Sequence, residues 1–435
     1  MPESAPNRSV MDLYIGIDLG TSGCRAIAID TTGTIQASAS RPLPGPQTQQ
    51  PQQSRQDPEI WWRTLLEVLA EIATSRVNDR VKGIAVDGTS STLLLCDPQG
   101  KPLTPALMYN DSSSLEQLPL LRSVAPDGNP VLSATSSLAK LLHLSQDLTT
   151  DRYLARHQAD WILGRLCDDY RYSDENNGLK LGYDPIQRQW PSWLARLPFP
   201  AAVLPDVVPC GTPVGKLCRQ VAEATGLSPG IPIIAGTTDG NAAFLATGAN
   251  QIGEAVSSLG STLVLKVLAD KPIFAAEFGV YSHHLGERWL VSGASNSGGA
   301  VLAHYFSREE MARMSRDLQP DRPTGLDYYP LLSPGERFPL NDPDYPPRLQ
   351  PRPEENRHFF QGMLEGIARI EASGYALLQT LGAPKPSRVY SVGGGARNEV
   401  WRQIRQKQLA LPVILAPQQE AAYGTALLAM RGIDG

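Results

Sequence analysis

The stretch that decides the fold runs from Leu13 to Asp30 and reads LYIGIDLGTSGCRAIAID. Two apolar runs, each long enough for a strand, flank a tight turn at Thr21–Gly23, and Thr31–Gly33 ends the second run. This pattern predicts a β-hairpin at the start of the fold. The turn carries glycine and hydroxyl side chains, and Asp18 lies where the first strand ends.

A helix is predicted after the loop that follows the hairpin. The segment 40–58 is rich in Gln and Pro and is expected to have no packed core. Asp57-Pro58-Glu59 then combines an N-cap residue with proline in the first helical turn, at the start of the run EIWWRTLLEVLAEIA. From the helical spacing we expect the apolar face of this helix to consist of Trp62, Leu65, Leu66 and Leu69.

Strands are predicted on both sides of a polar turn further along the chain. The residues Gly83–Val86 form one apolar run, Asp87–Ser91 a polar turn, and Leu93–Cys96 a second apolar run. Strands that alternate with helices in this way favour an α/β sheet core.

The chain repeats its first motif. Asp18–Ser22 and Ser258–Thr262, 240 residues later, both place a glycine and a hydroxyl pair between two apolar strands. A third glycine turn, Gly393–Gly395, lies between the strand RVYSV and a predicted helix, where free N–H groups favour an anion or a closely approaching ligand. The repeat suggests two related α/β halves with a cleft between them.

The composition excludes several classes of protein. With 435 residues, and roughly 150 residues per domain, the chain is long enough for two or three domains, and two large ones fit best. Lys and Arg number 39 and Asp and Glu 44, so the net charge of −5 offers no broad positive surface. No apolar run approaches the ~18 residues of a membrane span. We therefore expect no nucleic-acid partner and no membrane partner.

Cysteine usage and the N-terminal residues indicate a cytoplasmic protein. The five cysteines are odd in number, widely spaced and never in a CxxC arrangement, which disfavours a disulfide framework and a structural zinc site. The first residues lack the basic region and unbroken apolar stretch of a secretory signal. Reduced thiols in the cytoplasm are expected, and the oligomeric state is left open.

The glycine turns do not match the two common nucleotide-binding motifs. The first turn has glycines at 16, 20 and 23, whereas a Rossmann fingerprint needs GxGxxG. The segment 211–217 is one residue short of a P-loop and has Leu217 where a hydroxyl belongs. An Asp-x-Gly-Thr turn remains, whose N–H groups and hydroxyls could hold phosphate oxygens while the carboxylate holds a metal ion. A purely structural hairpin could carry the same residues.

This turn resembles the phosphate-binding hairpin of the actin, Hsp70 and sugar-kinase superfamily. The text YSVGGGARNEVWRQIRQKQLALPV and the tail EAAYGTALLA resemble the C-terminal signature of the FGGY carbohydrate kinases. Further matches occur in order from about Leu13 to Ala429: SRQDPEIWW, AVDGTSST, ALMYND, SSLAKLLHL, QADWILGRL, SDENNGLKLGYD and AGTTDGNAA. Within the family, DGTSSTLLL, SSLAKL, NNGLKLGYD, SLGSTLVLK and LDYYPL are most similar to the D-ribulose kinases of cyanobacteria and to plant xylulose-kinase-like proteins.

The resemblance implies an architecture and an activity. It implies an α/β protein with two ribonuclease-H-like domains around a central cleft. Residues 1–246 with 420–435 would form the sugar and catalytic side, and residues 247–419 the nucleotide side. The implied reaction is phosphorylation of D-ribulose to D-ribulose 5-phosphate with ATP and Mg²⁺. Two alternatives stay open: a D-xylulose or other polyol kinase of the same family, and an actin-like ATPase without a sugar acceptor.

The resemblance also implies the catalytic residues. Phosphoryl transfer needs positioning, charge stabilisation and a base for the acceptor hydroxyl. Asp239 matches the family's catalytic base, although an Asp at this point could also cap the following helix. Asp18 matches the second carboxylate, close to the sugar and to Mg²⁺, and Thr21 would line the phosphate-transfer position.

The sugar site is implied on the same side of the protein. The residues expected to contact the substrate are Asp18, Ser22, Gly23, Cys24, Thr89, Ser90 and Asp239. Asn110 and Asp111 occupy a substrate-contacting position of the family. The usual Trp two residues before the acid is absent, because Tyr109 precedes Asn110, and this leaves their contacts open. His143 stands where an aromatic residue is common and is interpreted as a structural replacement.

The nucleotide site is implied in the other half. Gly260, Ser261 and Thr262 match a second phosphate-binding turn, with Thr21 from the first. Gly394, Gly395 and Asn398 match the adenosine-binding segment, where glycine lets the backbone approach a flat base. Trp401 shares a helix face with Asn398 and could flank adenine, or could be a core residue.

Overall fold

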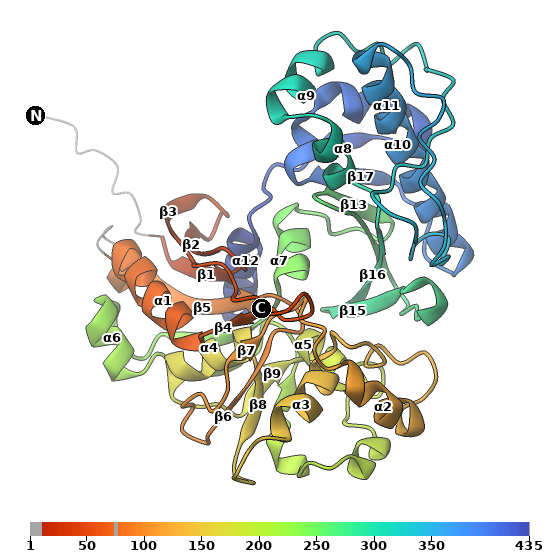
Figure 1. Ribbon diagram of the computed structural model, residues 1–435. Helices are drawn as coiled ribbons and strands as arrows, with labels where there is room; N and C mark the ends of the chain where they lie inside the picture. The colour runs from red at the N-terminus through yellow and green to blue at the C-terminus, as the bar shows by residue number, and fades with distance from the viewer. Residues whose placement is uncertain (1–10, 74–76, 435) are drawn as a thin grey trace, which may run out of the picture. The chain divides into compact units, whose positions relative to one another are not determined.

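The computed structural model describes residues 11–73 and 77–434. The chain divides into two compact units, one comprising Met1–Ala246 with Glu420–Gly435 and the other Thr247–Gln419. Each unit is described by itself below, with the elements labelled in Figure 1. Among the described residues, no helix is both long and apolar enough to cross a membrane.

The first unit contains most of the shorter elements. Its strands are β1 (Leu13–Leu19), β2 (Gly23–Asp30), β3 (Ile35–Pro42), β4 (Arg55–Gln56), β5 (Val81–Gly88), β6 (Leu93–Cys96), β7 (Ala106–Leu107), β8 (Leu154–His157), β9 (Tyr172–Asp174), β10 (Asp206–Val208), β11 (Pro213–Lys216) and β12 (Pro232–Thr238). Its helices are α1 (Pro58–Ala73), α2 (Leu118–Val124), α3 (Ser137–Ser145), α4 (Gln158–Cys167), α5 (Glu175–Leu181), α6 (Arg219–Thr225), α7 (Asp239–Ala246) and α12 (Ala421–Asp434).

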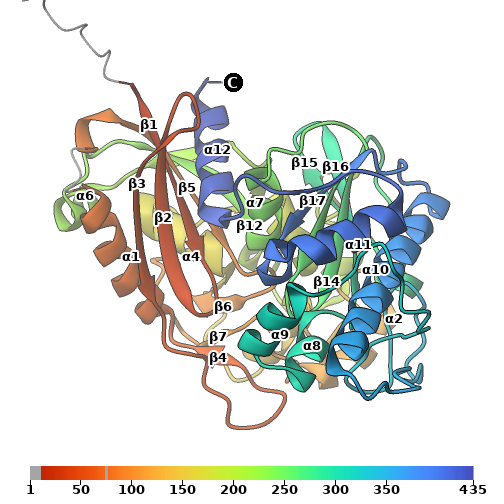
Figure 2. The same ribbon diagram turned by 90° about the horizontal axis from the view of Figure 1, so that it is seen from above.

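The main sheet of this unit has six strands in the order β11-β12-β5-β1-β2-β3. The predicted hairpin is confirmed, because β1 and β2 pair antiparallel from Leu13 with Asp30 to Leu19 with Cys24. Strands β5 and β12 then extend the sheet in parallel with β1. All seven residues of β1 are buried, since helices cover both faces of the sheet. Figure 2 shows α1 and α12 on opposite faces.

The C-terminal helix α12 packs unusually close to β1. A Cβ atom on Gly16 would lie 2.0 Å from the carbonyl oxygen of Ala422 and 2.1 Å from the amide nitrogen of Ala426. Glycine in the strand therefore lets the helix backbone lie directly on the sheet. The end of α12 is also held, because the hydroxyl of Tyr14 donates to the Asp434 carboxylate at 2.8 Å.

Two smaller sheets carry the loops of the first unit. Strands β4, β7, β6 and β8 form one sheet and β9 pairs with β10 in the other. A separate apolar cluster lies under them and includes Leu93, Leu95, Leu138, Leu141 and Leu181. Helix α3 is thereby fixed against β6, which begins just after the predicted polar turn.

The second unit has a simpler set of elements. Its strands are β13 (Glu254–Leu259), β14 (Leu263–Ala269), β15 (Tyr281–Leu285), β16 (Arg288–Ser295), β17 (Arg388–Val392) and β18 (Val413–Leu415). Its helices are α8 (Gly299–Tyr305), α9 (Arg308–Ser315), α10 (Asn356–Thr380) and α11 (Glu399–Leu409).

The two units share one sheet topology. The second sheet has the order β15-β16-β14-β13-β17-β18, with β13, β14 and β16 antiparallel and β13, β17 and β18 parallel. The run β16-β14-β13-β17-β18 thus repeats β3-β2-β1-β5-β12 of the first unit in order and direction. The repeat suggested by the sequence is therefore structural, and the predicted α/β class with two such domains is confirmed.

Two local expectations need correction. Helix α1 begins as predicted, with Asp57 accepting a hydrogen bond from the Glu59 amide at 3.0 Å. Its buried face, however, is built from Trp61, Leu65, Val68, Leu69 and Ile72, while Trp62 and Leu66 are only half-buried. The buried face is rotated because α1 packs against both the sheet strands β2 and β3 and the helix α6. The local sequence pattern contains no information about these neighbours.

The second correction concerns the polar turn after the strand predicted over 83–86. Strand β5 continues through Asp87 and Gly88, and the Asp87 side chain is fully buried. The sequence pattern predicts that a polar turn begins at Asp87. Pairing with β1 and β12 keeps the backbone extended there instead.

Candidate active site

The predicted catalytic residues of the first unit lie at one edge of its sheet. Strands β1, β5 and β12 are parallel neighbours, so their carboxyl ends meet at the same edge. Beyond these ends lie the turn at 20–23, the turn at 88–92 and Asp239. In open α/β sheets ligands bind outside the carboxyl ends of the strands. The topology therefore gathers residues that are more than 200 positions apart in sequence.

Asp18 and Asp87 form a buried pair of carboxyl groups at this edge. They are partners in the β1–β5 register, Asp18 is 6% exposed and Asp87 is 0% exposed. Burial raises the pKa of Asp87 well above its usual range, and the neighbouring charge of Asp18 adds to that effect. Burial also raises the pKa of Asp18, although the Arg25 guanidinium and a hydrogen bond with Asp87 oppose the shift. Two facing carboxylates do not both ionise readily, so Asp87 is the group that keeps its proton.

The surroundings of this pair come from α12 and β2. The Thr425 hydroxyl donates a hydrogen bond to Oδ2 of Asp87. Arg25 Nη1 donates to Oδ2 of Asp18 at 3.2 Å, and Arg25 Nε lies 3.8 Å from a carboxylate oxygen of Glu420. A partly exposed guanidinium beside a glycine turn is suited to phosphate oxygens.

The turn between β1 and β2 is held from three sides. Its backbone closes with the Gly20 amide donating to the Gly23 carbonyl at 3.0 Å, and the Leu43 amide donates to the Ser22 carbonyl at 2.9 Å. Gln56 Nε2 donates to the carbonyl of Thr21 at 3.3 Å. The side chains of Thr21 and Ser22 are half-buried and exposed, respectively. This leaves both hydroxyls accessible on a fixed backbone.

Cys24 is placed differently from the rest of the predicted sugar contacts. Its side chain is 0% exposed and belongs to the apolar core of the first unit, with Trp61 and Leu65 among its members. Burial, together with the charge of Asp18, raises the pKa of the thiol. The thiol is therefore an inert core group rather than a surface for a sugar hydroxyl.

Asp239 is the first residue of α7 and directly follows β12. Its side chain is half-buried, and its Oδ1 accepts a hydrogen bond from the Gly240 amide at 2.6 Å. Its charge acts on Asp87, since it contributes to the raised pKa of that group. The contact with the Gly240 amide and a role toward a substrate are compatible, because a carboxylate has two oxygens and about four lone-pair directions.

Thr89 and Ser90 lie in the turn between β5 and β6. The Thr89 amide and hydroxyl each donate to Oε1 of Gln158 at 2.9 Å. The Thr89 and Thr92 hydroxyls are 2.6 Å apart. Ser90 is half-buried and lies between two tightly held neighbours. The structure thus brings Thr89 and Ser90 to the same sheet edge as Asp18 and Asp239.

The structure also places Asn110, Asp111 and His143, whose contacts the sequence leaves open. The Asp111 carboxylate is fully buried and accepts hydrogen bonds from the Ser54 amide at 2.7 Å and from the Ser113 amide and hydroxyl at 3.0 and 2.5 Å. It is therefore used to join two loops. Tyr109 and Asn110 are exposed, and Tyr109 is 48% exposed. His143 is half-buried on α3.

The second unit presents a matching pair of turns at its own sheet edge. Gly260, Ser261 and Thr262 connect β13 to β14, and the segment 298–300 lies directly on them. The Gly299 amide donates to the Gly260 carbonyl at 2.9 Å, and the Ala300 amide donates to the Ser261 carbonyl at 3.0 Å. Nothing in the local sequence of 298–300 pointed to this contact.

The glycine turn after β17 lies beside the turn at Gly260–Thr262. Strands β13 and β17 are parallel, with Ser258 opposite Val392, so the two turns leave the sheet at the same edge. Gly393 has φ of +85°, and a Cβ atom there would lie 2.9 Å from the carbonyl oxygen of Leu259. Glycine is required at 393 by both the backbone conformation and the space. Gly394 is exposed, with nothing within 4 Å of its added Cβ position.

Asn398 and Trp401 have structural contacts of their own. Asn398 is the N-cap of α11, and its Oδ1 accepts from the Trp401 amide at 3.1 Å while its Nδ2 donates to the Ser315 hydroxyl at 2.9 Å. Trp401 is 2% exposed and donates from Nε1 to the Leu364 carbonyl at 3.1 Å. The core interpretation of Trp401 is therefore the one that its burial supports. A Cβ atom on Gly395 would lie 2.5 Å from Cζ3 of the Trp401 ring, so the ring leaves room only for glycine there.

A buried ion pair supports this turn. The Arg405 guanidinium on α11 bonds both carboxylate oxygens of Glu371 on α10, at 2.6 and 2.7 Å, and also bonds the Ser391 hydroxyl on β17. Both charged side chains are fully buried. The pair fixes the helices behind β17, from whose end the glycine turn extends.

Sequence reasoning missed Asp87, Arg25, Gln158, Arg405 and the segment 298–300. Asp87 could have been found by extending the strand through its alternation, because Gly83, Ala85 and Asp87 share one face and Asp87 then aligns with Asp18. The other residues have no local signal, since each is defined by a partner on a different element.

Comparisons with known proteins identify the family of this chain. Residues 13–246 match the family model described as the FGGY family of carbohydrate kinases, N-terminal domain. Residues 255–433 match the corresponding C-terminal domain. The xylulose kinase of Escherichia coli is 26% identical over 415 residues, which cover 90% of this chain and 84% of that protein. The xylulose kinase of Bacillus subtilis is 26% identical over 449 residues, covering 97% and 88%.

Solved structures share the fold. A xylulose kinase from Rhodospirillum rubrum matches with a TM-score of 0.84 at 24% identity, covering 97% of this chain and 90% of that one. A gluconate kinase from Lactobacillus acidophilus matches with a TM-score of 0.85 at 16% identity, covering 97% and 89%. Because both halves of the chain match the family and the fold agrees throughout, the chain belongs to the FGGY family of carbohydrate kinases.

Proposed function

We propose that this carbohydrate kinase transfers the γ-phosphoryl group of ATP to the terminal hydroxyl of a ketopentose, with D-ribulose as the substrate. The observation that carries the proposal is the convergence of Asp18, Asp87 and Asp239 at one sheet edge, next to the turn that holds Thr89 and Ser90. Carboxylates that differ in environment take different acid–base roles.

In this proposal Asp239 is the general base. It accepts the proton of the acceptor hydroxyl while that oxygen attacks the γ-phosphorus, and the bond from phosphorus to the β-phosphate oxygen breaks to release ADP. Help of this kind is worth about 10²–10⁴-fold. Thr21, Ser22 and Gly23 line the transferring phosphate, and Arg25 neutralises part of its charge.

Asp18 stays ionised in this proposal, and two contacts support that assignment. Arg25 bonds Oδ2 of Asp18 at 3.2 Å, and protonated Asp87 bonds it from the next strand. Thr89 and Ser90 orient the sugar hydroxyls on the same edge. The half-buried Asp239 then faces the reacting end of the sugar rather than solvent.

The residues fit a magnesium ion that is bound together with the nucleotide. Among residues 11–73 and 77–434, no group of three His, Cys, Asp or Glu side chains could hold a metal ion. Mg²⁺ usually keeps several waters and uses one or two carboxylates plus substrate phosphates. Asp18 would hold it, and the ion would neutralise charge on the phosphates.

The second unit supplies the nucleotide contacts in this proposal. Gly260, Ser261 and Thr262 meet phosphate oxygens, and the exposed Gly394 with Gly395 meets the adenosine. The adjacent ends of β13 and β17 support this division, because they bring both turns to one edge. Asn398 acts by capping α11 and holding the turn in shape.

A second candidate substrate is D-xylulose, which differs from D-ribulose in the configuration at one carbon. The observation that favours it is the name of the curated relatives, since the two described above are xylulose kinases. The first substrate is supported by the resemblance of motifs such as DGTSSTLLL and NNGLKLGYD to those of D-ribulose kinases.

The test is a coupled assay of ADP release over a panel of D-ribulose, D-xylulose, L-ribulose, gluconate and glycerol. We expect the highest kcat/KM with D-ribulose, and phosphate on its terminal oxygen by NMR. A higher kcat/KM with D-xylulose would replace the first substrate by the second. ADP release that does not depend on any sugar would favour an ATPase without a sugar acceptor.

A further inference from the structure

The turn at 88–92 is held in a conformation that it would not adopt by itself. Ser91 has φ of +65°, which lies in the left-handed region that non-glycine residues rarely occupy. Such a residue persists only where its surroundings impose the conformation, and residues of this kind gather at ligand sites. The groups that impose it are therefore of interest, because Thr89 and Ser90 precede Ser91 directly.

Lys140 on α3 holds the turn from one side. Its side chain is 0% exposed, and its Nζ donates to the carbonyl of Ser91 at 2.8 Å. The same nitrogen donates to the carbonyl of Met108 at 2.7 Å and to that of Tyr109 at 3.5 Å. One ammonium group thus joins the strained turn to the turn that carries Tyr109 and Asn110.

Gln158 on α4 holds the turn from the other side. Its Oε1 accepts both the amide and the hydroxyl of Thr89, and its backbone amide donates to the carbonyl of Thr92 at 3.1 Å. The side chain is 0% exposed, and its Nε2 has no hydrogen-bond partner among the described residues. The side chain of Gln158 therefore makes its hydrogen bonds through Oε1, and these bonds hold Thr89 in place.

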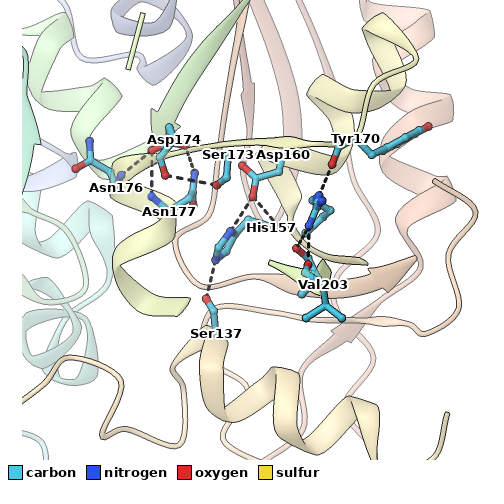
Figure 3. Close-up of polar contacts among 11 residues, drawn as sticks. Ser137, His157, Asp160, Tyr170, Ser173, Asp174, Asn176, Asn177 and Val203 are labelled. Carbon is cyan, nitrogen blue, oxygen red and sulfur yellow. Dashed lines mark hydrogen bonds and ion pairs between the residues drawn. The ribbon is translucent and has the colours of Figure 1, made fainter. Parts of the chain in front are cut away.

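The two helices that carry these residues are themselves joined. Figure 3 shows His157, the residue before α4, between Ser137 on α3 and Asp160 on α4. His157 Nδ1 donates to Asp160 Oδ2 at 2.8 Å, and its Nε2 lies 2.9 Å from the Ser137 hydroxyl. The order Ser, His, Asp is that of a hydrolase triad, but all three side chains are buried, which leaves no access for a substrate. These contacts connect α3 to the start of α4, and so they fix Lys140 and Gln158 relative to each other.

We propose that Lys140 and Gln158 are positioning residues that clamp the turn at 88–92 and, through Lys140, lock it to the turn at 108–110. The two segments would then present one rigid surface to the sugar. The inference rests on the proposed function in taking the ligand of this surface to be a ketose. It assigns sugar affinity and the discrimination between epimers to two residues that do not touch the sugar.

Lys140→Met tests the clamp and Arg156→Met is its matched control. Arg156 is also a buried cation of the first unit, and it donates to the carbonyls of Ala155, Tyr170 and Val203. None of these carbonyls belongs to either turn. Gln158→Leu removes the other half of the clamp without removing a charge, and serves where Lys140→Met does not fold.

We expect Lys140→Met and Gln158→Leu to raise KM for the ketose by about tenfold or more, because small misplacement of a positioning group is costly. KM for ATP should stay within about twofold, and the preference between D-ribulose and D-xylulose should shrink. Arg156→Met should lower Tm while leaving KM for the ketose within about twofold. An unchanged ketose KM in both clamp variants, or an equal rise in Arg156→Met, would overturn the proposal.

A second measurement separates this proposal from the proposed function. If the wild-type protein phosphorylates no ketose of the panel, the substrate assignment fails while the clamp can still be tested by amide hydrogen exchange. Faster exchange at 89–92 and 109–113 in Lys140→Met, but not in Arg156→Met, supports the clamp. Equal exchange in the two variants contradicts it.

Discussion

Asp18 and Asp87 face each other across neighbouring parallel strands, and both carboxyl groups are buried. A pair of this kind is stable when one member is neutral and donates a hydrogen bond to the other. Thr425 on α12 supplies the remaining contact, to Oδ2 of Asp87. The C-terminal helix is thereby connected to the edge of the sheet where we place catalysis.

Replacing Asp87 by Asn should therefore be mild. An amide can still accept from Thr425 and donate to Asp18, as the neutral acid does. We expect kcat within about threefold of the wild type. Asp87→Ala removes the hydrogen bond to Asp18 and the acceptor on β5 of the Thr425 hydroxyl, so it should lose about 1–3 kcal/mol of unfolding free energy. Steady-state kinetics and thermal unfolding check both variants. Equal damage in the two would show that an ionised Asp87 is required.

Replacing Asp239 by Asn should remove turnover while leaving the fold intact. The half-buried carboxylate is lost as a base, but an amide oxygen can still accept from the Gly240 amide. We expect kcat to fall by about 10²–10⁴-fold, with ADP binding unchanged by calorimetry. Asp239 leaves the base role if sugar-dependent turnover survives.

Gly16→Ala should weaken the contact between β1 and α12. Its Cβ would lie 2.0 Å from the Ala422 carbonyl oxygen, so the helix has to move. A loss of about 3 kcal/mol in unfolding free energy is expected. Gly45→Ala is the control, because nothing lies within 4 Å of its added Cβ. It should stay within about 0.5 kcal/mol of the wild type by denaturant unfolding.

Arg405→Met should destabilise the second unit. It leaves the buried Glu371 carboxylate without its partner, at an expected cost of about 3–5 kcal/mol. It should also weaken ADP binding, since Arg405 bonds Ser391 two residues before Gly393. Arg402→Met breaks a partly exposed pair with Glu399 and a long hydrogen bond to the Val413 carbonyl, and it should cost about 0–1 kcal/mol. Calorimetric unfolding and ADP titration distinguish the two variants.

The stability of the wild type should rise relative to Lys140→Met between pH 7 and 10. Burial lowers the pKa of Lys140 to about 7, although the Asp111 carboxylate opposes this shift. In the unfolded chain Lys140 keeps its ordinary pKa. In that window the unfolded state binds more protons than the folded state, so unfolding becomes less favourable as pH increases. The slope should be at most about 1.4 kcal/mol per pH unit. A pH-independent difference between the two proteins would contradict the lowered pKa.

Much of this architecture was readable from the chain itself. Leu13–Asp30 predicts the hairpin because apolar residues on both sides of a glycine turn have few other solutions. The repeat at Ser258–Thr262 predicts a second unit, and five strands of each sheet share one order. Glycine turns after strands mark where ligands approach, since backbone conformation and close approach are properties of a few adjacent residues.

Tertiary structure alone decided which partners complete each site. Asp87 became a buried partner of Asp18 through strand register, and Lys140 and Gln158 reached the turn at 88–92 from helices about 50 and 70 residues away. Trp401 and Cys24 became core residues through packing. Local sequence specifies backbone geometry, whereas burial and hydrogen-bond partners depend on elements that meet only after folding. The contacts that set the charge state of a carboxyl group and the shape of a strained turn belong to this second kind.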